Sequence, residues 1–301
     1  MLPLVSVIIA TYNRSNVLSY SIRSLQAQTV TDWELIVVGD ACTDNTADVV
    51  AQFQDDRIRF INLPRNIGEQ SGPNNVGMGE ARGAYIAFLN HDDFWFPDHL
   101  AVALQTLTTQ SADFALATGL VIQPDKSIYY LGVMPQKRFL PNAFVPASGW
   151  VFRREVLAKV PAWRSYRDLW IYPSHDFLRR AYQAGLRLEP THQFTFLAIP
   201  SGNRVNSYRE RQQHEHDYYF EYLIRHPERR AELLMTVLAQ ANNELHYRSW
   251  SLIWQGVKNL IKLPLIRRGI VTIEWRMMMK HPRKGDALQA LRAVRGLAKL
   301  P

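Results

Sequence analysis

The sequence predicts an α/β protein in which a mostly parallel central sheet lies between layers of helices and a helical C-terminal region follows. Through the first third of the 301 residues, short apolar runs alternate with segments whose apolar residues recur at helical spacing. The apolar runs are rich in β-branched residues and end in polar turns, which is typical of strands covered on both faces. After residue 209 the pattern is helical and gives no clear strand signal.

The elements follow in a regular order along the chain. Strands are expected at residues 5–10, 33–38, 58–60, 84–89, 114–118 and 128–133, with another entering the 149–157 segment. Helices are expected around residues 18–25, 49–53, 97–107 and 174–181. The 62–83 segment is rich in Gly, Asn and Pro, which predicts tight turns that let backbone approach a ligand, or else an irregular connection.

Residues 86–93 read Ile-Ala-Phe-Leu-Asn-His-Asp-Asp, an apolar run that stops at two adjacent carboxylates. Ligands of open α/β sheets bind outside the carboxyl ends of the strands, so Asp92 and Asp93 form the first candidate site. The two carboxylates repel each other unless a divalent cation or a hydrogen-bond donor lies between them. The alternative is that they cap the next helix or form a turn.

The composition, with 47% hydrophobic and 21% charged residues, is that of an ordinary folded protein. No apolar stretch reaches the roughly 20 residues that a membrane-spanning helix needs. A single cysteine, Cys42, excludes an intramolecular disulfide framework and fits a reducing compartment. The amino end shows no basic leader or cleavage pattern, so we expect no signal peptide and a cytoplasmic location.

The net charge of +8 comes from the end of the chain, because residues 241–301 hold twelve Lys or Arg against three acidic residues. Trp250 and Trp254 fall on one helical face of this tail, with Lys258 and Lys262 nearby. This pattern predicts a peripheral contact with the inner face of the plasma membrane. Packing on the core or on a second subunit is the alternative, and no nucleic-acid-binding motif supports a nucleic acid partner.

Four motifs resemble family 2 glycosyltransferases in order and spacing. They are residues 6–14 (SVIIATYNR), residues 37–46 (VVGDACTDNT), the loop with Asn66, Gly68 and Asn75, and residues 88–93 (FLNHDD). The resemblance is strong over residues 4–100 and weaker up to Tyr208. It implies the GT-A fold, a Rossmann-like α/β/α sandwich over residues 1–208 whose halves, 1–100 and 101–208, bind the nucleotide sugar and the acceptor. The basic helical region is then residues 209–301.

The resemblance also implies the reaction, an inverting transfer of a sugar from a nucleotide-diphosphate sugar. Thr11, Tyr12 and Arg14 are expected at the base and diphosphate end of the donor, where a hydroxyl, an aromatic face and a cation are suitable partners. Asp40 matches the acidic residue that accepts a hydrogen bond from the nucleotide base.

Asn66 and Asn75 are expected to contact the donor from their loop. Asp92 and Asp93 match the end of the family's aspartate motif, which holds the ribose and a divalent metal, Mn²⁺ or Mg²⁺. Asp93 is the expected principal metal ligand.

Two positions depart from the family pattern. Gly39 and Asn90 stand where aspartates are more common, so the site keeps two of three carboxylates at the 90–93 turn. Asn90 can still bond a sugar hydroxyl but carries no charge. Metal binding through Asp93 survives this departure.

Asp176 is the expected base that removes the proton from the acceptor hydroxyl, because it stands where the family carries an acidic pair ahead of a helix. The alternative is a carboxylate in the first turn that only balances the helix dipole. His175 replaces the usual acidic neighbour and is expected to tune Asp176 or to contact the acceptor.

Other residues stay open between a functional and a structural reading. His192, His214 and His216 are candidate metal ligands or solvated surface residues. Arg204 and Tyr208 are candidate contacts of the acceptor or the diphosphate. Cys42 is interpreted as a small turn residue and not as a nucleophile.

The expected function is therefore a glycosyltransferase acting in cell-surface polysaccharide or glycolipid synthesis, on a carbohydrate or lipid-linked acceptor. A nucleotidyltransferase that makes nucleotide sugars is one alternative, although the 11–14 turn lacks the glycines of such enzymes. A non-catalytic nucleotide-sugar-binding protein is another, favoured by the missing carboxylates at Gly39 and Asn90.

Overall fold

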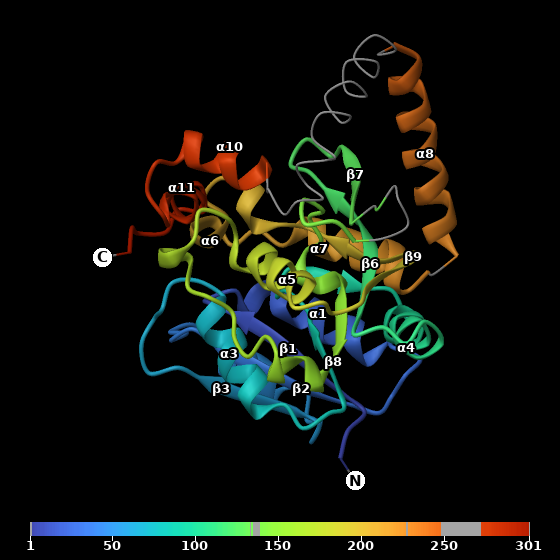
Figure 1. The fold of residues 1–301 in the computed structure, drawn as a ribbon. Coiled ribbons are helices and arrows are strands. Elements are labelled where there is room, and N and C mark those ends of the chain that lie inside the picture. Colours follow the sequence, from blue (N-terminus) through green and yellow to red (C-terminus); the bar gives the residue numbers. More distant parts are fainter. Residues whose placement is uncertain (1, 133, 135–138, 227, 248–271, 301) are drawn as a thin grey trace.

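The structure is a computed structural model that describes residues 2–132, 134, 139–226, 228–247 and 272–300. Within this part of the chain, nine strands form one sheet in the order β3-β2-β1-β4-β8-β6-β9-β5, and β7 pairs with β6 (Figure 1). Helices pack on both faces of the sheet. The predicted α/β class is confirmed.

The first half of the sheet is parallel and follows the predicted order. Its strands are β1 (Val5–Thr11), β2 (Trp33–Gly39), β3 (Ile58–Asn62) and β4 (Tyr85–Phe88). The helices between them are α1 (Ser15–Gln26), α2 (Thr46–Ala51) and α3 (Ser71–Glu80). Thr11 pairs with Gly39 and Ile8 with Phe88, so the carboxyl ends of β1, β2 and β4 meet at one edge of the sheet.

Helix α3 lies in the 62–83 segment, where the sequence predicted only turns or an irregular connection. That prediction was wrong for Ser71–Glu80. A Cβ added to Gly77 would lie 2.5 Å from Cγ2 of Ile8, so the glycine lets α3 pack directly on β1. This packing overrides the low helix propensity of the segment.

The second half of the sheet is mixed. Its strands are β5 (Asp93–Trp95), β6 (Phe114–Ile122), β7 (Ile128–Leu131), β8 (Trp150–Arg153) and β9 (Leu188–Ala198), and its helices are α4 (His99–Thr109) and α5 (Pro173–Gln183). β9 runs parallel to β6, whereas the β4–β8, β6–β8, β6–β7 and β5–β9 pairs are antiparallel. β5 and β9 were not predicted.

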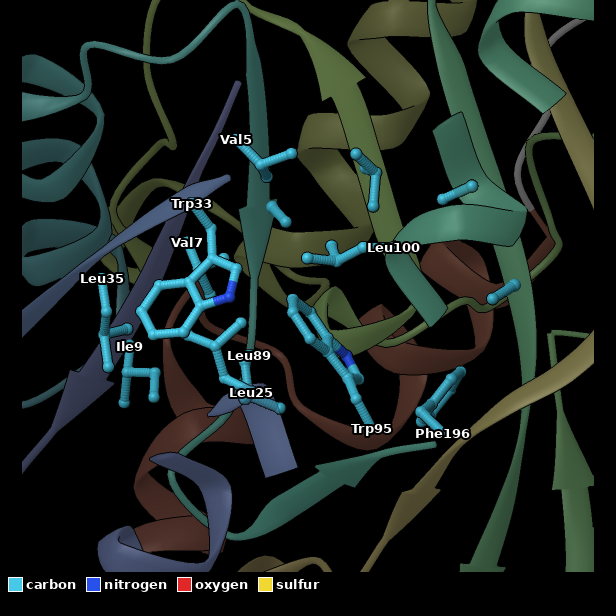
Figure 2. Packing of buried hydrophobic residues seen from close by; sticks show 14 of the residues in the cluster. Val5, Val7, Ile9, Leu25, Trp33, Leu35, Leu89, Trp95, Leu100 and Phe196 are labelled. Carbon is cyan, nitrogen blue, oxygen red and sulfur yellow. The ribbon is translucent and has the colours of Figure 1, made fainter. Parts of the chain in front are cut away.

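The core lies on both faces of the sheet. Val5, Val7 and Ile9 of β1 join a buried cluster with α1 and α4, which Figure 2 shows around Trp33 and Trp95. Ile8 points to the opposite face and joins a second cluster with α3 and α5. The uniformly apolar β1 therefore has both faces covered, as predicted.

The C-terminal region is helical where the structure describes it. It contains α6 (Ser207–Glu210), α7 (His214–Tyr219), a π-helical turn (Phe220–Ile224), α8 (Arg229–Tyr247), α10 (Thr272–Lys280) and α11 (Asp286–Val294). Figure 1 shows α11 close to α6, and Asn206 N donates to Val294 O at 2.8 Å. The predicted face of Trp250 and Trp254 lies outside the described residues.

Candidate functional site

A cleft of about 490 Å³ lies where the carboxyl ends of β1, β2 and β4 meet. Thr11, Tyr12, Asp40, Asp92 and Asp93, all predicted site residues, line it. Parallel pairing of their strands brings these residues together although they are far apart in sequence. The structure places the five residues in one cleft, and their roles there stay predictions.

Asp40 is held rigidly by the loop that follows β3. Its carboxylate accepts hydrogen bonds from Ile67 N and Gly68 N, both at 2.7 Å, and from Asn66 Nδ2 at 3.2 Å. Asn66 Nδ2 also donates to the backbone oxygen of Asp40 at 2.7 Å. Burial raises the pKa of Asp40, and the two amide hydrogen bonds partly oppose this effect. Asn66 therefore orients Asp40.

Asp92 and Asp93 are both buried in the turn after β4. Asp92 Oδ2 accepts hydrogen bonds from Ser201 N at 2.8 Å and Ser201 Oγ at 2.6 Å. Burial opposes ionisation of Asp92, but neighbouring His91 and the Ser201 hydrogen bonds hold its pKa below the usual range. Burial and the charge of Asp92 raise the pKa of Asp93. The two carboxylates are therefore unequal.

The two departures from the family pattern have local explanations. A Cβ added to Gly39 would lie 2.6 Å from Oδ1 of Asn62, so a larger residue there requires the Asn62 side chain to shift. Asn90 Nδ2 donates to Asp93 Oδ2 at 2.8 Å, and Ser148 Oγ donates to the same oxygen at 2.5 Å. An amide at position 90 thus binds the carboxylate that an aspartate would repel.

Two tyrosines form one wall of the cleft. The rings of Tyr12 and Tyr208 stack with centroids 6.4 Å apart, and the Arg14 guanidinium lies 5.3 Å from the Tyr208 ring. Arg14 is buried, lies outside the described lining and donates from Nη1 to Ser207 O at 2.5 Å. Arg14 packs against Tyr208 of this wall, and its contact with the nucleotide-sugar donor stays a prediction.

Asn75 and Asp176 also lie outside the lining in the described chain. The Asn75 amide exchanges two hydrogen bonds with the backbone of Trp163, at 2.8 and 3.0 Å. Asp176, in the first turn of α5, has no exposed surface and accepts a hydrogen bond from Arg180 Nε at 2.7 Å. Ser174, two residues earlier, does line the cleft.

The open candidates divide clearly. Tyr208 lines the cleft, whereas Arg204 is paired with Glu215, with 2.5 Å between Nε and Oε2. His216 is buried and its ring packs 5.7 Å from that of Phe94, so it is not a solvated surface residue. His192 and His214 are exposed. Among the described residues, no group of three His, Cys, Asp or Glu is placed to hold a metal ion.

Cys42 is half-buried, and its Sγ lies 3.6 Å from Thr11 O. Burial raises the pKa of its thiol, which keeps it protonated and fits the interpretation as a turn residue. His175 makes no hydrogen bond to a residue that lines the cleft in the described part of the chain. Its Nε2 lies 2.6 Å from Pro141 O.

Helix α11 adds residues that the sequence did not predict. Leu288, Leu291, Arg292 and Arg295 of this helix and its C-terminal flank line the cleft. The only signal in the sequence is the basic, amphipathic character of the tail, which does not say where it packs.

The comparisons with known proteins agree with this geometry. The sequence model described as Glycosyl transferase family 2 matches residues 6–160. A UDP-Glc:alpha-D-GlcNAc-diphosphoundecaprenol beta-1,3-glucosyltransferase, WfgD of Escherichia coli, is 34% identical over 134 residues, covering 44% of this chain and 52% of WfgD. The chain spans about half the length of the curated relatives that it matches.

Two solved structures share the fold. Staphylococcus aureus TarS in complex with UDP-GlcNAc has a TM-score of 0.56 at 21% identity, covering 65% of this chain and 58% of TarS. The mannosyltransferase PcManGT of Pyrobaculum calidifontis, in complex with GDP-Man and Mn²⁺, has a TM-score of 0.53 at 19% identity, covering 66% and 58%.

Proposed function

The chain belongs to glycosyl transferase family 2, and we propose that it transfers a sugar from a nucleotide-diphosphate sugar to an acceptor hydroxyl with inversion. The observation that carries this proposal is the convergence of Tyr12, Asp40, Asp92 and Asp93 on one cleft at the carboxyl ends of parallel strands. TarS, which shares the fold, was solved in complex with UDP-GlcNAc, and this supports a nucleotide-sugar donor.

The nucleotide base would bind beside Tyr12 and Asp40. Asp40 is already fixed by the 66–68 loop, so it offers a preorganised acceptor at little entropic cost. The Tyr12 ring offers an aromatic face.

The carboxylate pair fits a divalent cation. Asp92 and Asp93 are adjacent and buried carboxyl groups, and Mg²⁺ sites commonly use one or two carboxylates with substrate phosphates. Asp93, with Asp92, would hold Mn²⁺ or Mg²⁺, which when bound neutralises the diphosphate as it leaves. The Mn²⁺ of the PcManGT complex supports this assignment.

Inversion needs a base that takes the proton of the acceptor hydroxyl as it attacks the anomeric carbon. We keep Asp176 as the proposed base because of its position in the sequence, ahead of a helix where the family carries an acidic pair. Its carboxylate is paired with Arg180 and lies near Arg164, 3.8 Å away. A direct role requires the Arg180 pair to open when the acceptor binds, whereas a role in positioning α5 requires it to persist.

The acceptor would enter past the other lining residues. They include the apolar and aromatic residues Val121, Tyr129, Leu131, Phe144 and Tyr172. Aromatic faces suit sugar rings, and an apolar wall suits a lipid-linked carbohydrate. The name of WfgD specifies a diphosphoundecaprenol acceptor, which supports a place in polysaccharide or glycolipid synthesis.

A peripheral membrane contact is part of the proposal. No described helix is long and apolar enough to cross a bilayer. Helix α10 exposes Trp275 and Met279 beside Arg276 and Lys280, a combination that favours a lipid interface.

The test is donor turnover by the whole chain. Release of UDP and GDP from a panel of UDP and GDP sugars is measured with and without Mn²⁺, with Asp93→Asn as the inactive variant. We expect Mn²⁺-dependent release from at least one donor. Binding of nucleotide sugars without release of UDP or GDP would support a non-catalytic binding protein. Release of pyrophosphate from a nucleoside triphosphate and a sugar phosphate would support a nucleotidyltransferase. Either result overturns the proposal.

A further inference from the structure

We propose that Arg295, at the C-terminal end of α11, binds the diphosphate of the donor, so that the donor site is built from both ends of the chain. The inference rests on the proposed function, because it assigns the ligand of the same cleft. It adds a cation to a site for which the sequence predicted Arg14 and left Arg204 as an open candidate.

Helix α11 is fixed against the loop that holds Asp40. Arg292 donates to Gly68 O at 2.6 Å and to Ala298 O at 2.9 and 3.0 Å. The Gln289 side chain and the backbone of Leu300 exchange two hydrogen bonds, at 3.1 and 3.2 Å. Tyr208 N donates to Arg295 O at 3.2 Å. The position of Arg295 is therefore set by contacts on both sides of the helix end.

The Arg295 guanidinium has no polar partner in the described part of the chain. It makes no hydrogen bond and no ion pair there, and its Nε is buried without a partner. It lies over the ring of Tyr208, whose centroid is 5.8 Å away, and beside Gly202. Arg14 and Arg292, by contrast, donate to backbone carbonyls.

An unpaired guanidinium in a cleft favours a phosphate, because its planar fork matches two phosphate oxygens. The same cleft contains Asp92 and Asp93, which would repel a diphosphate. The Tyr208 ring contacts three groups of the cleft, since it stacks on Tyr12, meets His91 edge to face and lies beneath Arg295. Arg295 thus offers a positive charge at the Tyr12–Tyr208 wall of the cleft.

The experiment compares ligands that differ only in phosphate content. Binding of uridine, UMP and UDP is measured by calorimetry on the full chain, or of the guanosine series if the parent prefers it. Arg295→Gln is compared with Lys299→Gln, which removes an exposed charge from the same tail.

We expect Arg295→Gln to weaken UDP about 10- to 100-fold, the value of a charged hydrogen bond, while uridine affinity stays within about twofold. Lys299→Gln should bind all three ligands like the parent. Arg295→Lys keeps the charge and most of the stem, so its affinity for UDP should lie between those of the parent and Arg295→Gln. This variant replaces Arg295→Gln if the latter does not fold.

Equal loss of uridine and UDP affinity, or unchanged UDP affinity, overturns the assignment while leaving the proposed function intact. A parent chain that binds neither UDP nor GDP overturns the proposed function itself, and the role of Arg295 with it.

Discussion

The Asn90 amide donates a hydrogen bond of 2.8 Å to the carboxylate of Asp93. The acidic turn after β4 therefore contains two carboxyl groups and one neutral donor. This arrangement limits the repulsion that a third buried carboxylate would add beside Asp92 and Asp93.

Asn90→Asp should destabilise the protein without added metal. The substitution removes the donor and places a further carboxylate against Asp93, at an expected cost of about 1–3 kcal/mol. Urea unfolding in EDTA measures the change, with Gln110→Glu as control because that amide is exposed. Equal unfolding midpoints for the parent and Asn90→Asp would contradict the role of Asn90.

Asp93→Asn should abolish the stimulation of donor turnover by Mn²⁺. A neutral amide is a poor ligand for a hard cation, so the rate should fall at least about 100-fold while the fold is retained. The control is Asp56→Asn, an exposed carboxylate in the turn before β3. The metal assignment fails if both variants respond to Mn²⁺ like the parent.

Asp176→Asn should retain donor binding and donor hydrolysis but lose transfer to the acceptor if Asp176 is the base. If Asp176 instead positions α5 through Arg180, the main effect is a loss of stability, because one partner of a buried ion pair is removed. Parallel transfer assays and thermal unfolding separate the two roles. Arg180→Gln breaks the same pair without touching the carboxylate and should reproduce only the stability effect.

His99 should make the protein less stable in acid. It is fully buried, with Nδ1 2.7 Å from Thr195 Oγ1 and its ring stacked on Trp95, and burial lowers its pKa to about 3. The unfolded chain binds a proton at about pH 6.5 that the folded chain does not bind. Its contribution therefore falls as the pH drops from about 6.5 to about 3, by up to about 1.4 kcal/mol per pH unit.

His99→Gln should remove this part of the pH dependence. The free energy of unfolding is measured by urea titration at pH 6.5, 5.5 and 4.5, and its slope against pH should be shallower than in the parent. His226→Gln, at an exposed site, should keep the parent slope. An unchanged slope in His99→Gln would show that another group controls the acid response.

Replacing Trp275 and Met279 with Ser should weaken binding to vesicles that contain an anionic phospholipid. The two side chains are 72% and 83% exposed, and loss of their apolar burial should lower affinity about tenfold or more. Met235→Ser, also exposed but on α8, is the control in vesicle sedimentation. Point variants are needed because truncation of the tail also removes α11 from the cleft. No binding by the parent chain would rule out the membrane contact.

The strands β1, β2 and β4 and the residues at their carboxyl ends were predictable from the sequence. Burial on both faces leaves a continuous apolar run, and parallel strands place their ends at one edge, so Tyr12, Asp40 and Asp93 could be assigned to one cleft. Each apolar run can be recognised within its own few residues, and the alignment of strand ends holds for parallel sheets in general.

Tertiary structure alone decided the rest of the site. Helix α3 forms because Gly77 fits against Ile8, and Asp176 is buried because Arg180 and α5 enclose it. Arg292 reaches Gly68 across 224 positions and brings Arg295 to the cleft. Such contacts depend on how distant surfaces fit together, and neither residue type nor periodicity near Arg295 specifies which surface it will meet.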